Sequence, residues 1–206
     1  METQERILTK AHELFMRYGL RSVSMDEIAN HLGMSKKTIY QYYADKDALV
    51  EGTIDIEIIQ SKKECDCHRN QSENAIHEIF MAVDMVQEML KHMNPSLMFD
   101  LEKYHPKAYR KFLEHKNKFF HEIIKTNLEW GIKDGLYRED INVELLTRFR
   151  LVTMFFMFDT ENFPAPKFTP GQVITEVTDN FLFGMATAKG QKLIIKYKQQ
   201  RQKKQI

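Results

Sequence analysis

The stretch "SMDEIANHLGMSKKTIYQYY", from Ser24 to Tyr43, contains two short helical patterns separated by a glycine. Ser24 and Glu27 match a capping box, in which each side chain satisfies a free backbone amide of the first helical turn. Gly33 ends this first pattern, and Ser35 is placed to cap the second. Two helices joined by a tight turn predict a helix-turn-helix, the motif whose second helix enters the major groove of DNA.

The second helix of this motif has a packing side and a polar side. Helical angles place Ile39 and Tyr43 on the side that packs against the neighbouring helices. The opposite side carries Lys37, Thr38 and Gln41, whose side chains are free to reach the edges of base pairs.

Tyrosines and lysines flank the polar side. Tyr40 and Tyr42 can donate their phenolic hydroxyls to phosphates on either side of a groove. Lys36 lies in the first turn of the helix, where free backbone amides attract anions, and Lys46 repeats this arrangement at the start of the next helix. These residue types predict phosphate contacts that set the register and base contacts that select the sequence. The alternative is a helical hairpin with a solvated lysine face.

Helical periodicity continues through the rest of the chain, without a convincing two-residue alternation. The first helix ends at Gly19, Asp45 can cap a fourth helix, and the polar interval 61–72 is expected to hold the end of that helix and a linker. Later helices are expected to begin at Ser72, Pro106, Asn142 and Thr169. The sequence therefore predicts an all-α fold of about nine helices.

The composition is that of an ordinary soluble globular protein, with 43% hydrophobic and 29% charged residues. No run of about 18 apolar residues is present, so no membrane-spanning helix is expected. The first ten residues lack the basic-then-apolar order of a secretory signal. The two cysteines, Cys65 and Cys67, are too close in sequence for a useful structural disulfide. A reducing cytoplasm is the expected location.

The net charge of +1 hides a basic C-terminus. The last 18 residues, "KGQKLIIKYKQQRQKKQI", carry seven Lys or Arg and no acidic residue. Such a stretch predicts a solvated helix end or a disordered terminus, and a contact with nucleic acid or another polyanion is the alternative.

From Arg6 to about Thr53 the chain closely resembles the tetracycline-repressor (TetR) family of bacterial transcription regulators. The likeness is carried by "RILTKAHELFMRYG" and "SMDEIANHLGMSKKTIYQYYADKDAL", in unbroken register. It implies a three-helix DNA-binding domain at residues 1–48, with its motif at about 24–43. A larger helical effector-binding and dimerisation domain is then expected at residues 49–206. The residues expected to face DNA are Ser24, Ser35, Lys36, Lys37, Thr38, Tyr40, Gln41, Tyr42 and Lys46.

Two positions depart from the family pattern. Phenylalanine is usual where Tyr43 stands, and histidine is common where Tyr42 stands. The first change is mild if the Tyr43 hydroxyl reaches solvent, and the second bears on the phosphate contact expected of Tyr42.

The family resemblance also implies a small-molecule effector in the second domain. Met and Phe residues beyond residue 79 suit an adaptable, largely apolar pocket, although the same residues at helical spacing also suit an ordinary core. The candidate lining residues are Met89, Met98, Phe99, Phe119, Ile123, Trp130 and Phe155.

The resemblance further implies a homodimer formed by the last two helices, about 143–159 and 170–190. Gly184 could permit close backbone approach there. Two recognition helices would then read successive major grooves of a palindromic operator in double-stranded DNA, and a small, mostly apolar effector would release the repressor. Two alternatives stay open: a regulator controlled by a protein partner without an effector, and a helical enzyme or carrier with a vestigial DNA domain.

No catalytic chemistry is indicated. The sequence has no Gly-rich phosphate loop, nucleophile elbow or convergent carboxylate pair. Cys65, Cys67 and His68 lack a second ligand pair nearby, whereas zinc sites need four ligands. No catalytic residue, metal site or cofactor is therefore predicted.

Overall fold

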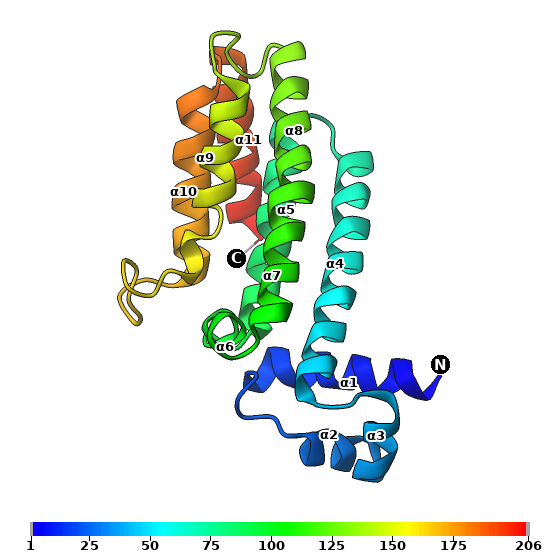
Figure 1. Ribbon diagram of the computed structural model, residues 1–206. Coiled ribbons are helices and arrows are strands. Elements are labelled where there is room, and N and C mark those ends of the chain that lie inside the picture. Colours follow the sequence, from blue (N-terminus) through cyan, green and yellow to red (C-terminus); the bar gives the residue numbers. More distant parts are fainter. Residues whose placement is uncertain (1, 205–206) are drawn as a thin grey trace. The chain divides into compact units, whose positions relative to one another are not determined.

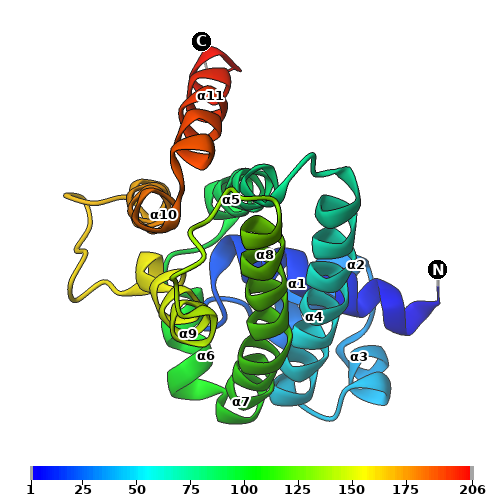
Figure 2. The ribbon, with the colours of Figure 1, turned by 90° about the horizontal axis from the view of Figure 1, so that it is seen from above.

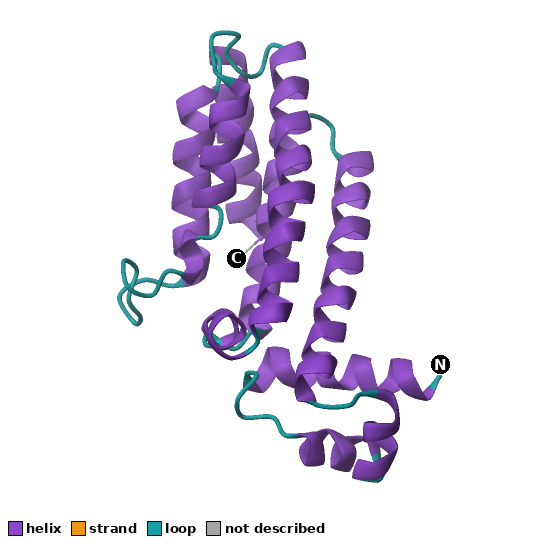
Figure 3. Cartoon of the chain, viewed as in Figure 1, coloured by secondary structure: helices purple, strands orange, loops and turns teal. Residues whose placement is uncertain are grey.

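A computed structural model describes residues 2–204, and every regular element among them is helical (Figures 1 and 3). The α-helices are α1 (Thr3–Tyr18), α2 (Met25–Leu32), α3 (Lys36–Tyr42), α4 (Lys46–Gln71), α5 (Ala75–His92), α6 (Leu97–Tyr104), α7 (Pro106–His115), α8 (His121–Lys133), α9 (Val143–Thr153), α10 (Pro170–Met185) and α11 (Ala188–Lys204). A π-helical turn, η1 (Lys116–Phe120), joins α7 to α8, and a 3-10 turn, η2 (Phe156–Phe158), follows α9. The predicted all-α class is confirmed, with eleven α-helices in the described residues rather than about nine.

Side-chain caps begin several helices where the sequence predicts them. Asp45, Asn142 and Thr169 each accept a hydrogen bond from the backbone N–H three residues later, at 2.8, 3.0 and 3.2 Å. Pro106 is the first residue of α7, where its missing N–H costs no helical hydrogen bond. These starts were predictable because a cap depends only on residues within one turn.

The junction between α4 and α5 differs from the expectation. Ser72 does not cap α5; its hydroxyl donates to the His68 carbonyl at 2.6 Å, at the end of α4. Asn74 caps α5 instead, accepting from the His77 N–H at 3.0 Å. The interval expected to hold a linker is therefore mostly helix, because α4 continues to Gln71.

The helix expected at about 143–159 is shorter than predicted, since α9 ends at Thr153. The following residues form a turn and then η2. β-branched and aromatic side chains dominate residues 152–158, and they lose rotamer freedom in a helix. Local propensity therefore explains the early end of α9.

The described residues divide into two compact units. Unit 1 holds residues 2–63 and 89–115, and its core joins Phe15, Ile28, Ile39, Leu49 and Leu101 from α1, α2, α3, α4 and α6. Burying a large aliphatic or aromatic side chain contributes about 1.5–3 kcal/mol. This shared core therefore holds the two helices of the quoted stretch against α1 and α4.

Unit 2 holds residues 64–88 and 116–204. In it α9 lies beside α8 (Figures 1 and 2). Its core includes Ile76, Leu128, Tyr137, Leu182 and Ile194, all shielded from solvent. The core thus runs from α5 to α11 and includes a helix beyond the last one predicted, which was expected at about 170–190.

The basic C-terminal stretch forms α11, except for its last two residues, which lie outside the described part of the chain. Ile194 and Tyr197 are buried, and the Tyr197 hydroxyl donates to Glu73 at 2.9 Å. Arg201 Nε donates to Asp84 Oδ1 at 2.6 Å. The stretch is therefore a packed helix with a lysine-rich outer side rather than a solvated end or a disordered terminus. The few apolar residues among its lysines gave only a weak periodic pattern, so the sequence did not predict a packed helix here.

Candidate nucleic-acid interface

The first helix of the motif begins with the predicted capping box. Ser24 Oγ accepts from the Glu27 N–H at 3.2 Å, and the Glu27 carboxylate accepts from the Ser24 N–H at 2.6 Å. This backbone hydrogen bond is the main cause of the lowered pKa of Glu27. At the other end, Gly33 has φ +63°, a left-handed conformation that glycine adopts without strain. The turn between the two helices is thereby fixed.

The second helix, α3, begins at a polar cap. Ser35 Oγ accepts from the Thr38 N–H at 3.1 Å and lies 2.8 Å from the Thr38 hydroxyl. Thr38 is half-buried, whereas Ser35 is exposed. Two of the hydroxyls predicted to face DNA, those of Ser35 and Thr38, therefore lie together at the start of α3.

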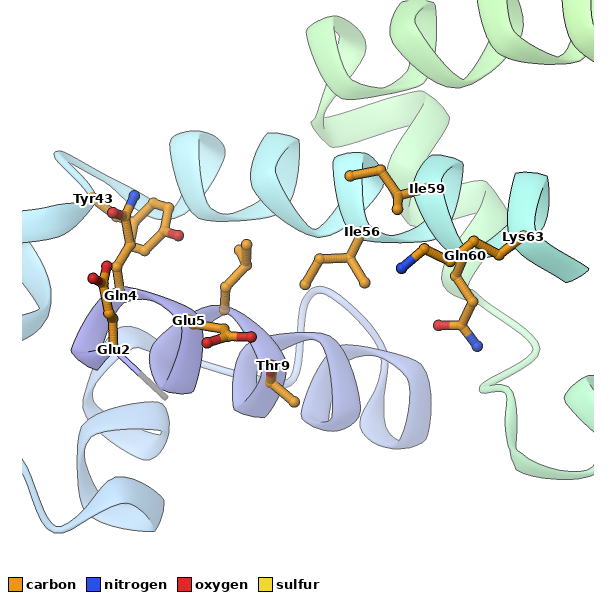
Figure 4. A pocket seen from close by; sticks show the side chains of 10 residues that line it. Glu2, Gln4, Glu5, Thr9, Tyr43, Ile56, Ile59, Gln60 and Lys63 are labelled. Carbon is orange, nitrogen blue, oxygen red and sulfur yellow. The ribbon is translucent and has the colours of Figure 1, made fainter.

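One side of α3 anchors the helix in unit 1. Ile39 is fully buried and Tyr43 is 7% exposed. Burial raises the pKa of Tyr43, and a hydrogen bond from its side chain to Gln4 opposes that rise. The Tyr43 side chain lies near Gln4 of α1 (Figure 4). The packing role predicted for Ile39 and Tyr43 is confirmed.

The opposite side of α3 is open. Lys37 and Gln41 are exposed, and Tyr40 and Tyr42 are 42% and 43% exposed. These are high values for tyrosine, because its ring usually packs against other apolar groups. The exposed strip thus carries hydrogen-bonding groups at positions where nothing in unit 1 covers them.

Both flanking lysines have partners within unit 1. Lys36 Nζ lies 2.9 Å from Asp26, and that hydrogen bond raises the pKa of Lys36. Lys46 is half-buried, and its ammonium donates to the Leu20 carbonyl. Burial lowers the pKa of Lys46. Periodicity does not reveal these contacts between helices, and the contacts of Lys36 and Lys46 with DNA stay a prediction.

A groove in unit 1 is not the predicted effector pocket. It has a volume of about 640 Å³, opens along α1 and α4, and none of the seven predicted residues lines it (Figure 4). Its lining consists of Glu2, Gln4, Glu5, Leu8, Thr9, Tyr43, Ile56, Ile59, Gln60 and Lys63.

The seven predicted pocket residues divide between the units. Met89, Met98 and Phe99 belong to unit 1, and Phe99 is 57% exposed. The remaining four belong to unit 2: Phe119, Ile123, Trp130 and Phe155.

Within unit 2, two of these residues are joined by an aromatic neighbour. The Phe120 ring lies 5.6 Å from that of Phe119 and 6.5 Å from that of Phe155, measured between centroids. Trp130 instead lies under the Arg69 guanidinium, 4.1 Å from it, and packs against the core of unit 2. The pocket assignment stays a prediction.

Other functional groups are sparse. No group of three or more His, Cys, Asp or Glu residues is arranged to hold a metal ion in the described part of the chain. Burial raises the pKa of Cys65 to about 11, which disfavours the reactive thiolate. Within residues 2–204, no helix is both long and apolar enough to cross a membrane.

Two features of the chain were not found from the sequence. Asp26 of α2 pairs with Lys36, and Arg150 is buried in unit 2. The only signal for the arginine was its place in the otherwise apolar run "RFRLVTMFFMF". Charged residues almost never bury fully without a partner, so an exposed position was the natural expectation.

The capped helix pair and the uncovered strip of α3 define a helix-turn-helix transcriptional regulator. Residues 7–53 match the family model described as "Bacterial regulatory proteins, tetR family". The N-terminal part of the chain therefore carries the DNA-binding domain of this family of bacterial regulators.

Relatives of known sequence extend the likeness beyond the first domain. The chain is 29% identical over 193 residues to the HTH-type transcriptional regulator YvaF of Bacillus subtilis (strain 168), covering 89% of this chain and 95% of the relative. It is 29% identical over 157 residues to the HTH-type transcriptional repressor KstR2 of Rhodococcus jostii (strain RHA1), covering 69% and 72%.

A solved structure shares the fold. The crystal structure of a transcriptional regulator from Cytophaga hutchinsonii ATCC 33406 superposes with a TM-score of 0.71 at 22% identity, covering 89% of this chain and 98% of that one. The N-terminal helix-turn-helix and the larger helical remainder are thus common to both chains.

Proposed function

We propose that this regulator is a repressor that binds a palindromic operator through α3 and is released by a small, mostly apolar effector. The observation that carries the DNA-reading part is the two-sided burial of α3. Ile39 and Tyr43 are buried, while Lys37 and Gln41 on the other side are exposed. A helix held in this way presents a rigid polar strip, which is what a major groove requires.

The strip supplies two kinds of contact. Lys37, Thr38 and Gln41 would read base edges, because lysine and glutamine match the acceptor and donor patterns of guanine and adenine. Tyr40 and Tyr42 would bond phosphates on the two sides of the groove and set the register.

Ser24, Ser35, Lys36 and Lys46 complete the proposed interface at the helix starts. Lys36 has to share or leave Asp26 to reach a phosphate. An exposed ion pair contributes only about 0–1 kcal/mol, so a phosphate can compete for this lysine. Lys46 would act more through the positive charge that it adds near the start of α4 than through a direct contact.

The proposed dimer uses α9 and α10. Leu145, Phe149 and Val152 are 59%, 51% and 57% exposed, and their spacing of four and three residues aligns them along one side of α9. Phe183 of α10 is also exposed, and an alanine at Gly184 would meet no atom within 4 Å. An exposed apolar row of this kind favours a symmetric partner, and two copies would make the operator palindromic.

The effector would act by a difference in affinity. A ligand that prefers one spacing of the two DNA-reading heads shifts the dimer toward that spacing. The relative KstR2 is named as a repressor, which supports negative control here. The cytoplasm, where the bacterial genome lies, is the proposed location.

A gel-shift titration tests the DNA-binding part. The full-length chain is titrated against DNA from upstream of its own gene, with a shuffled duplex of the same composition as the control. We expect a preference for the upstream DNA and an affinity that falls steeply with salt, because bound lysines displace counterions. Equal binding to both duplexes would contradict sequence-specific regulation.

A further inference from the structure

Unit 2 buries two polar atoms that have no hydrogen-bond partner among the described residues: Arg150 Nη1 and Thr147 Oγ1. Both residues belong to α9, and their spacing of three places them on the same side of that helix. Thr147 is fully buried and Arg150 is 8% exposed. Buried donors without an acceptor are rare in folded proteins, so this pair indicates an acceptor that the chain itself does not supply.

The rest of the Arg150 side chain is fixed. Its Nη2 donates to Thr178 Oγ1 at 2.9 Å, and its guanidinium lies 5.4 Å from the Phe181 ring centroid. Burial lowers the pKa of Arg150 to about 10, which still leaves it charged at neutral pH. The side chain is therefore an oriented cation with one nitrogen available.

Nearby acids of unit 2 have other partners. Asp179 follows Thr178 in α10, but Lys198 binds its carboxylate. Glu78 accepts from Arg69 at 2.9 Å and from Asn127 at 2.6 Å.

Tyr137 does not supply a negative charge either. Its hydroxyl donates to Asn127 Oδ1 at 3.2 Å, and burial raises its pKa, so it stays neutral. Arg150 forms no ion pair within residues 2–204. A buried cation without a counter-ion strongly favours an incoming anion, because the surrounding dielectric constant is low.

Apolar side chains and a second cation adjoin the end of α9. Lys116 begins the π-helical turn η1, and its ammonium lies 4.2 Å from the Phe155 ring centroid. Phe119 and Phe120 of the same turn form the aromatic cluster with Phe155. The turn η1 packs against α9. π-helical turns are frequent at functional sites, which agrees with a ligand at this place.

We propose that unit 2 binds an organic monocarboxylate with an apolar body, whose carboxylate accepts hydrogen bonds from Arg150 Nη1 and Thr147 Oγ1. Two donors match the two oxygens of one carboxylate. A phosphate group carries about −1.5 to −2 charges and three acceptor oxygens, and these two donors would leave it under-bonded. The apolar body would lie against the aromatic cluster beside η1. Release of the operator by this ligand rests on the proposed function, whereas binding of the carboxylate does not.

Binding of decanoate to the full-length chain tests the site, with decanamide as the uncharged counterpart. Isothermal titration is expected to show decanoate binding about ten- to hundredfold more tightly than decanamide, since the hydrogen bonds involve two charged groups. Arg150→Met and Thr147→Val should each reduce that preference. Arg148→Met is the matched control, because Arg148 is exposed on the same helix and pairs with Glu144.

The stability of each variant separates a binding role from a purely structural one. Replacing a buried, uncompensated charge should not lower the melting temperature of the ligand-free protein. If Arg150→Met melts lower while Thr147→Val keeps the full preference for decanoate, the two residues are structural and the proposal is wrong. Equal binding of decanoate and decanamide by the unaltered chain would also overturn it.

Gel shifts keep this proposal distinct from the proposed function. Decanoate that binds with the expected preference but leaves operator affinity unchanged supports the anion site and contradicts the effector role. If the unaltered chain shows no sequence-specific DNA binding, the regulator proposal is contradicted, and the result of the decanoate titration is not affected.

Discussion

His105 Nδ1 lies 2.5 Å from Asp47 Oδ1. His105 ends α6 and is only 9% exposed, whereas Asp47 stands in the first turn of α4, just after the recognition helix α3. The pair therefore ties the helix that follows α3 to the α6–α7 corner of unit 1.

Asp47→Asn should lower the free energy of unfolding by about 1–3 kcal/mol, because a buried imidazole loses its charged acceptor. Urea denaturation monitored by circular dichroism measures the change. The matched control is Asp55→Asn: neither member of the Asp55–Lys111 pair is buried, and its loss should cost at most about 1 kcal/mol. Equal losses in both variants would contradict a special role for the bond to the buried His105 imidazole.

Tyr40→Ala should weaken binding to all operator sequences evenly, whereas Gln41→Ala should relax preference at one or two base pairs by about 1–3 kcal/mol each. The reason is that a phosphate contact carries no sequence information. Selection of bound duplexes from a randomised operator library measures both effects. Identical specificity profiles for the two variants would refute the assignment.

Phe149→Glu should raise the dimer dissociation constant by an amount equivalent to about 2 kcal/mol or more, because it places a charge in the middle of the proposed interface. Sedimentation velocity at several concentrations measures the dissociation. Ile59→Glu is the control, because Ile59 is 55% exposed on α4 of unit 1, outside the proposed interface. An unchanged dimer in Phe149→Glu would remove α9 from the interface.

Two glycines should respond oppositely to alanine. A Cβ at Gly131 would lie 2.0 Å from the ring of the fully buried Tyr137, so Gly131→Ala should destabilise the fold by about 1–3 kcal/mol or more. Gly184→Ala meets nothing within 4 Å and should stabilise the protomer by about 0.5–1 kcal/mol. Chemical denaturation of both variants checks the signs; if both destabilise equally, the contact with Tyr137 is not the cause.

Acidification should weaken the fold partly through His115. Burial lowers the pKa of His115, and the charge of Lys62 lowers it further. The unfolded chain takes up this proton near pH about 6.5, before the folded chain does, so stability falls as pH drops from there toward the folded pKa. His115→Gln should reduce the change of the urea midpoint between neutral and mildly acid pH. His31→Gln, which alters an exposed histidine, is the control and should leave that change as it is in the unaltered chain. A slope unchanged by His115→Gln would refute this origin.

The sequence predicted the parts of the fold that local chemistry determines. Ser24 and Thr169 begin helices as expected, since a cap and the amide that it satisfies lie within one turn. Ile39 and Tyr43 were correctly placed inside because helical periodicity sorts the two sides of a short helix.

Contacts between segments that are distant in the chain could not be predicted from the sequence. The bond from Lys46 to the Leu20 carbonyl depends on how two helices pack, and so does the burial of Arg150. α11 was missed for a related reason. Ile194 and Tyr197 are buried because they pack against α5 and the residues just before it, and lysines outnumber them in the sequence. Periodicity reports one helix at a time, whereas burial is decided by its neighbours.

The inward contacts of α11 bear on how the protein can be handled and altered. Tyr197 and Ile194 close over Phe80 and Ile76. A stop codon or a protease cut before Ile194 would therefore expose an apolar patch on α5. The truncated protein should aggregate at concentrations at which the intact chain does not.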